Sequence, residues 1–246
     1  MTIKTNLAAR ANYGSSRATG TIKYIVLHYT GNDGDTDESN GKYFRDNDVG
    51  VSAHYFVDDD SVTRSVPDNY VAWAVGGKKY ASCAQTGGGK FYGKCTNANS
   101  ISIEMCDSKK DGTVQASDET IANAQALTLE LMKKYNVPVE NVIRHFDVTG
   151  KLCPAYMVDE KKWAAFKAGL EDDMKLSDMN FSELTDTQVE QLFNRIQKHL
   201  RTQSATMAKE LKEAKDLGIT DGTYPLAIPT REQVAVMVKR GVKGLK

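Results

Sequence analysis

The chain has 246 residues and carries 32 basic and 32 acidic side chains, so its formal net charge is zero. A balanced charge disfavours binding to nucleic acid or to an anionic membrane surface, because both attract proteins with an excess of positive charge. No apolar run is long enough for a membrane-spanning helix, and the first residues lack the apolar core of a secretory signal. The sequence therefore predicts a protein made in the cytoplasm without a signal peptide and without membrane insertion.

Three short segments in the first half have the apolar, β-branched and aromatic composition of strands. They are residues 24–29, 51–57 and 100–106. The first is predicted to be a buried strand that ends at His28, because turn-forming residues follow it at once. The three strands could share one sheet.

A helix is predicted between Ser117 and Tyr135, where apolar residues recur at helical spacing. Ser117 is its expected N-cap, and Asn136 is its expected stop. A further helix over residues 163–170 is expected to close this part of the chain. Strands interspersed with helices predict an α/β fold.

The composition changes near residue 171, where a polar and amphipathic stretch begins. The predicted domains are therefore residues 1–172, an α/β domain, and residues 173–246, a small and mainly helical C-terminal domain. Apolar residues between positions 189 and 214 fall on one helical face. This face is consistent with a helical hairpin, with a stripe that forms a homo-oligomer, or with a solvated helical linker.

Four cysteines are too few for a disulfide scaffold in a chain of this size. Cys83 and Cys95 could pair in an oxidising environment, but plain thiols are the favoured interpretation. Cys106 follows a predicted strand and is assigned to the core. Cys153 has a different setting, because it lies eight residues after His145 in a segment that contains Gly150.

Two imidazoles and one thiolate are the candidate metal ligands of this chain: His28, His145 and Cys153. Three such ligands are the number that a catalytic zinc uses when its fourth tetrahedral position stays open. Gly150 suits a tight loop that brings His145 and Cys153 together. Lys151 adds a positive charge close by, for which a structural zinc site has no use. The pattern favours a zinc hydrolase, although the spacing alone is not a general zinc signature.

Glu104 is the candidate general base and acid. Strand alternation places it on the face opposite Ile101 and Ile103, and there it could take a proton from the attacking water and return it to a leaving amine. A solvated glutamate on a half-exposed strand is the alternative. Lys151 could stabilise an oxyanion, or it could be an ordinary loop lysine. We expect His54 to be a hydrogen-bonded core histidine, because a fourth ligand would close the metal site.

These segments together resemble the zinc-dependent N-acetylmuramoyl-L-alanine amidases of the phage-lysozyme and peptidoglycan-recognition-protein type, the amidase-2 family. The resemblance covers roughly residues 20 to 165 and rests on residues 25–28, 51–55, 72–74, 99–104, 144–145 and 151–154. It implies a central mixed β-sheet flanked by helices, and Zn2+ held in a groove by residues matching His28, His145 and Cys153. Trp73 is a candidate for the substrate-binding wall of that groove.

The resemblance also implies a reaction, which is hydrolysis of the amide between N-acetylmuramic acid and L-alanine in bacterial peptidoglycan. One branch of the family uses a tyrosine just before the histidine that matches His54, but Ala53 occupies that place here. The other branch uses a glutamate that matches Glu104, and Lys151 matches the family's catalytic lysine. Relatives that only bind the wall typically lack the cysteine ligand, so Cys153 argues for a working enzyme.

The absence of a signal peptide and the separate C-terminal unit resemble a phage or prophage endolysin, which reaches the cell wall after release. Residues 1–172 are then the zinc amidase catalytic domain, and residues 173–246 are expected to bind the wall or to self-associate. Two other functions stay open. One is a cysteine peptidase with Cys153 as nucleophile and His145 as base, and the other is a non-catalytic wall-binding module.

Overall fold

The computed structural model describes residues 2–177. Residues 178–246 contain most of the predicted helical C-terminal domain and lie outside the described residues. The domain division at residue 172 and the functions assigned to residues 173–246 therefore stay predictions. No helix in the described part of the chain is long and apolar enough to cross a membrane.

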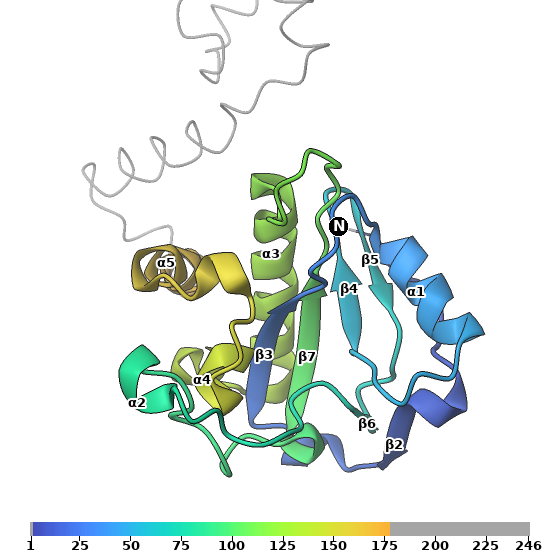
Figure 1. The fold of residues 1–246 in the computed structure, drawn as a ribbon, viewed down its shortest axis with the longest axis horizontal. Coiled ribbons are helices and arrows are strands. Elements are labelled where there is room, and N and C mark those ends of the chain that lie inside the picture. Colours follow the sequence, from blue (N-terminus) through green and yellow to red (C-terminus); the bar gives the residue numbers. More distant parts are fainter. Residues whose placement is uncertain (1, 178–246) are drawn as a thin grey trace, which may run out of the picture. The chain divides into compact units, whose positions relative to one another are not determined.

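A mixed six-stranded sheet forms the centre of the described fold (Figure 1). Its strand order is β1-β5-β4-β7-β3-β8, and only β4 and β5 pair in antiparallel fashion. The strands of this sheet are β1 Thr2–Thr5, β3 Tyr24–Tyr29, β4 Tyr55–Val57, β5 Ser61–Arg64, β7 Ser100–Met105 and β8 Val142–Arg144. A separate two-stranded sheet pairs β2, Tyr13–Ser16, with β6, Tyr70–Ala72. The predictions of an α/β fold and of a mixed central sheet with flanking helices are confirmed for this part of the chain.

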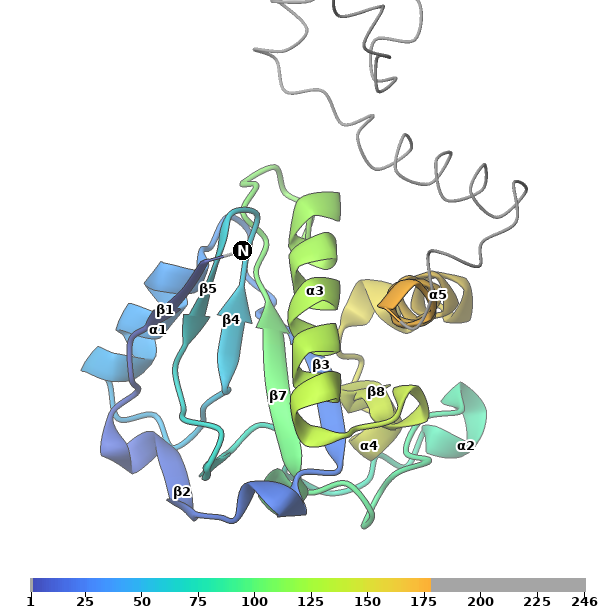
Figure 2. The ribbon, with the colours of Figure 1, turned by 180° about the vertical axis from the view of Figure 1, so that it is seen from behind.

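One face of the central sheet carries the main apolar core. Helix α3, Asp118–Tyr135, crosses this face (Figure 2), and its Leu127 and Leu131 pack with Ile101 and Ile103 of β7. The helix begins and ends as expected, because the Ser117 hydroxyl accepts from the Thr120 amide and Asn136 adopts the left-handed conformation with φ 52°. Helix α5, Glu160–Ser177, adds Trp163, Phe166 and Leu170 to the same core.

The opposite face of the sheet is covered in part by α1, Asp37–Asp46. Phe44 of this helix stacks on Phe56 of β4, with ring centroids 5.3 Å apart. Phe56 and Glu104 are paired in register on neighbouring strands. Because side chains alternate between the two faces of a strand, Glu104 lies on this second face, away from the main core.

The strand predicted over residues 51–57 is shorter than expected, since regular pairing starts only at Tyr55. The cause lies in His54. The Ser102 amide donates to the His54 ring Nδ1 at 3.0 Å. In a longer strand, a backbone carbonyl would accept this hydrogen bond instead. Ser52 is bonded instead to Trp73, which directly follows β6: the Ser52 amide donates to the Trp73 carbonyl, and the Trp73 amide donates to the Ser52 hydroxyl.

Candidate metal-binding active site

Three parallel strands bring the candidate residues to one edge of the sheet. β3 pairs with both β7 and β8, and His28 is paired in register with Glu104 near the carboxyl ends of β3 and β7. β8 ends at Arg144, and His145 opens the short helix α4, His145–Thr149. Parallel strands end at the same edge, so residues far apart in the sequence meet there.

His28, His145 and Cys153 form one buried group. The candidate ligand atoms of these three residues all lie within 4.8 Å of one another. The Cys153 Sγ is 3.8 Å from His28 Nδ1, although the two residues are 125 positions apart. The two imidazole rings meet edge to face with centroids 4.8 Å apart. The predicted convergence of these three side chains is confirmed.

The nitrogen atoms of this group have few partners inside the protein. His28 Nε2 and both ring nitrogens of His145 are buried without a hydrogen bond. A buried polar atom without a partner destabilises the fold, unless a bound ligand supplies that partner. Burial, together with the closeness of the His145 imidazole and the Lys151 ammonium group, holds the pKa of His28 well below its ordinary value. Burial and Lys151 lower the pKa of His145 to about 4. Both rings are therefore neutral, as metal ligation requires, and this group could bind a metal.

Glu104 lies beside His28 but is not one of the three grouped candidate ligands. Its Oε1 lies 3.8 Å from His28 Nδ1, and its Oε2 is buried without a hydrogen bond. Burial raises the pKa of Glu104 to about 8, against the opposing charge of Lys151. A carboxyl group whose pKa is near neutrality can both accept and return a proton.

The segment between His145 and Cys153 folds back on itself. The Phe146 amide donates to the Cys153 carbonyl at 2.9 Å. Gly150 ends α4 in the left-handed conformation, with φ 84°, and an added Cβ there would lie 2.4 Å from the Cys83 Sγ. The turn thus needs a glycine, for its backbone and for its lack of a side chain.

Arg144 connects the two segments that carry His145 and Cys153, a role that was not predicted from the sequence, where it counted only as part of the family resemblance. Its side chain is 2% exposed and lies against the rings of Phe146 and Trp163. Nε and Nη2 donate to the two oxygens of Asp147, and Nη1 donates to the Met157 carbonyl at 2.8 Å. An arginine that follows two apolar residues and directly precedes a candidate ligand is the sequence signal that could have revealed it.

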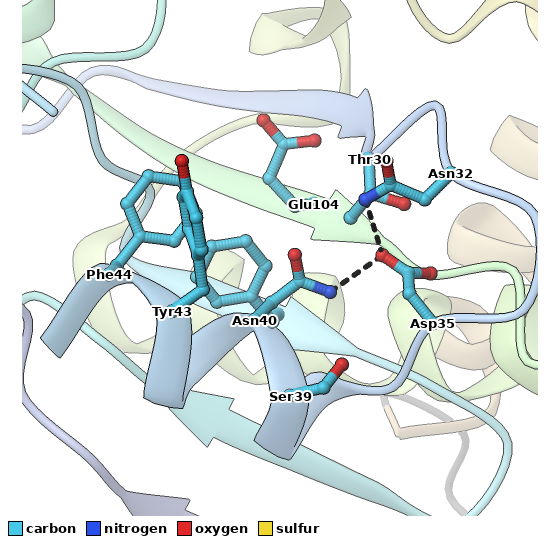
Figure 3. A pocket seen from close by; sticks show the side chains of 9 residues that line it. Thr30, Asn32, Asp35, Ser39, Asn40, Tyr43, Phe44 and Glu104 are labelled. Carbon is cyan, nitrogen blue, oxygen red and sulfur yellow. Dashed lines mark hydrogen bonds between the residues drawn. The ribbon is translucent and has the colours of Figure 1, made fainter. Parts of the chain in front are cut away.

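Two hollows reach residues of the candidate site. The first has a volume of about 540 Å³ and reaches Glu104. Figure 3 shows Glu104 on its strand and Asn40 and Tyr43 of α1 around this space, with the Asn40 amide donating to Asp35. The second has a volume of about 570 Å³ and is lined by His145, Lys151 and the segment 74–80. Lys151 thus faces a hollow that His145 also lines.

The remaining candidates have other surroundings. His54 is fully buried, its Nε2 lies 3.1 Å from the Tyr70 carbonyl, and it is not among the grouped ligand atoms, so the core assignment is confirmed. Trp73 is 37% exposed, its ring packs near Gly14 of β2, and it lines neither of the two hollows. Its substrate-binding role stays a prediction. All four cysteines are free and buried; plain thiols were the favoured interpretation for Cys83 and Cys95, and Cys106 was assigned to the core.

The described fold and this group define an α/β protein with a buried two-histidine, one-cysteine site that could bind a metal. A comparison with known protein families matches residues 18–156, more than half of the chain, to N-acetylmuramoyl-L-alanine amidase. The chain belongs to this amidase family.

Individual relatives agree with this assignment. The chain is 35% identical over 144 residues to the N-acetylmuramoyl-L-alanine amidase CwlL of Bacillus licheniformis, a match that covers 56% of this chain and 38% of CwlL. Among solved structures, the catalytic domain of XlyA is 30% identical with a TM-score of 0.54, covering 69% of this chain and 99% of that domain. PlyL is 34% identical with a TM-score of 0.54, and the match covers 69% of this chain and 97% of the PlyL chain. The chain thus matches about two fifths of the length of CwlL but nearly all of the two solved chains.

Proposed function

We propose that this chain is a zinc-dependent N-acetylmuramoyl-L-alanine amidase, which hydrolyses the amide between N-acetylmuramic acid and L-alanine in bacterial peptidoglycan. The observation that carries the proposal is the convergence of His28, His145 and Cys153, with unpartnered ring nitrogens, beside Glu104 and Lys151. The family match and the amidase relatives support the same bond as the target.

Each residue of the site has one task in this proposal. His28, His145 and Cys153 would hold the zinc, which when bound supplies Lewis-acid polarisation and a more acidic water. Glu104 accepts a proton from the attacking water and returns it to the departing alanine amine. The ammonium group of Lys151 stabilises the negative charge that develops on the carbonyl oxygen.

The wider role in this proposal is that of an endolysin that acts on the cell wall after release. It is supported by a likeness to a mutant endolysin from Bacillus subtilis, which is 29% identical with a TM-score of 0.54 and covers 69% of this chain and 98% of that chain. Residues 173–246 would then supply wall binding or self-association.

The cysteine-peptidase alternative fits the geometry less well. Cys153 is 2% exposed, and the imidazole within 3.8 Å of its Sγ belongs to His28, whereas that hypothesis assigns the base to His145. A nucleophilic thiol needs access to the substrate and an activating base within reach.

One experiment separates the alternatives. The purified full chain is analysed for metal and then incubated with purified peptidoglycan, and the released amino termini are identified. The amidase predicts one zinc per chain, new alanine amino termini, loss of both after chelation, and recovery with added Zn2+. Activity that survives chelation and disappears on alkylation would establish the peptidase. Wall binding without new amino termini would establish the non-catalytic module.

A further inference from the structure

The hollow on the His145 side is strongly basic. Its lining residues are Ala74, Gly76, Gly77, Lys78, Lys79, Tyr80, His145, Thr149 and Lys151. Three of these residues carry an ammonium group, and none carries a carboxylate. The hollow therefore has an uncompensated positive charge, although the whole chain is neutral.

These lysines are also unpaired. Lys78, Lys79 and Lys151 are exposed, and their ammonium groups form no salt bridge or hydrogen bond with any residue in the described range 2–177. Elsewhere, Lys134 binds the Asp68 carboxylate at 2.9 Å. Lys78 and Lys79 are thus free to bind an external anion, while Lys151 faces the reaction centre.

The hollow on the Glu104 side has the opposite character. Its lining includes the carboxyl groups of Asp35 and Glu104, the amides of Asn32 and Asn40, and the ring of Tyr43, and it contains no basic residue. This hollow therefore offers an anionic ligand no positively charged partner. A neutral ligand with hydroxyl and amide groups would find donors, acceptors and aromatic surface instead.

The substrate of the proposed function has the same asymmetry. On one side of the scissile amide stands an amino sugar, with hydroxyl and N-acetyl groups. On the other side stands the stem peptide, whose acidic residue and carboxyl terminus supply carboxylates. An ammonium group binds a carboxylate through a charge-assisted hydrogen bond, and opposite charges also fix the orientation of a ligand.

We propose that Lys78 and Lys79 form a subsite for a carboxylate of the stem peptide, so that the peptide side of the substrate occupies the basic hollow beside His145. This inference rests on the proposed function and extends it, because it assigns the two sides of the cleaved bond to the two hollows. The sugar side then lies toward Asn40 and Tyr43. Lys151 is left for the carbonyl oxygen.

The test measures equilibrium binding to the zinc-loaded full chain. The two probes are stem tripeptides of the same sequence. In one every carboxylate is free, and in the other every carboxylate is amidated. The protein variants are the double substitution Lys78→Gln and Lys79→Gln, and a control with Lys23→Gln and Lys133→Gln. The control removes the same charge from two exposed lysines that line neither hollow.

The wild type should bind the free-carboxylate peptide at least about tenfold more tightly than the amidated one, and added salt should weaken that preference. The Lys78 and Lys79 double variant should lose the preference, whereas the control should keep it. A wild type that binds both peptides equally, or neither, would overturn the subsite, as would a double variant that still discriminates.

Hydrolysis of intact peptidoglycan by the same wild-type preparation is measured in parallel. Cleavage without discrimination between the peptides contradicts the subsite and leaves the amidase intact. Discrimination without cleavage supports the subsite and contradicts the amidase. The two proposals can therefore fail separately.

Discussion

Glu104 and His28 face each other across the parallel strands β7 and β3, paired in register, with Oε1 3.8 Å from Nδ1. The register fixes this relationship, because residues paired on neighbouring strands point to the same face of a sheet. The sheet itself therefore holds a carboxyl group beside a candidate metal ligand, independently of the loops.

Glu104→Gln should sharply reduce the proposed amidase activity while leaving the site assembled. Glutamine keeps the shape of the side chain but cannot accept and return a proton, so kcat should fall by about a hundredfold or more. Zinc content should stay the same because Glu104 is not one of the three grouped ligands. Metal analysis and release of alanine amino termini measure the two effects, and Glu140→Gln, at an exposed position, is the control. Full activity of the Glu104 variant would remove Glu104 from the mechanism.

Arg144→Lys should weaken metal binding as well as stability. Lysine cannot reach both oxygens of Asp147 and the Met157 carbonyl at once, so the segments that carry the ligands lose their common anchor. The free energy of unfolding should fall by about 2 kcal/mol or more, and the zinc dissociation constant should rise. Arg45→Lys, in an exposed pair with Asp46, should change neither. Unchanged zinc affinity in the folded Arg144 variant would limit Arg144 to a structural role.

Much of the site could be predicted from the sequence because its residues sit on strongly patterned elements. A short apolar run predicts the strand that carries His28, and period-two alternation places Glu104 on the face opposite Ile101 and Ile103. The 100–106 segment and the helix after Ser117 were confirmed to within a residue or two. Register and convergence were beyond reach, since nothing local says which strands are neighbours.

The elements that escaped prediction lack an apolar signal. Helix α1 buries Asp37, Asn40 and Gly41 rather than an apolar stripe, and its start depends on Thr36 and Ser39 capping each other. β1 is a short edge strand that pairs only with β5. The hollow beside Glu104 is lined in part by α1, so its shape could not be inferred either.

Asp68→Asn should reduce stability in a pH-dependent way. Asp68 is 6% exposed and accepts hydrogen bonds from Tyr55, at 2.6 Å, and from Lys134 and Tyr135. Burial opposes ionisation of this carboxyl, but the three donors outweigh it, so the pKa of Asp68 lies below its ordinary value. A lowered pKa in the folded state adds stability above the unfolded pKa of about 3.9, and this stability is lost as the pH falls through the folded value.

The Asp68 variant should therefore lose about 1 to 3 kcal/mol of unfolding free energy at pH 7. The difference from the wild type should stay constant down to about pH 5 and shrink below about pH 4. Denaturant unfolding across this range measures it, with Asp46→Asn as an exposed control. A difference that does not vary with pH would mean that packing, and not the charge, accounts for the loss.

Gly150→Ala should disturb the turn between His145 and Lys151 for two separable reasons. The positive φ of 84° costs an alanine about 1 kcal/mol, and the new Cβ would meet the Cys83 Sγ at 2.4 Å, which adds about 1 to 3 kcal/mol of overpacking. Gly93 also has a positive φ, of 76°, but a Cβ added there would meet no atom within 4 Å. Gly93→Ala should therefore lose only the backbone contribution of about 1 kcal/mol. Adding Cys83→Ala removes the clashing sulfur and should bring the cost of Gly150→Ala close to that of Gly93→Ala in a double-mutant cycle, with only one close contact left, to the Tyr80 Cβ at 3.3 Å. If the cost of Gly150→Ala is the same with and without the Cys83 sulfur, the clash is not what requires a glycine there, and the backbone conformation alone explains it.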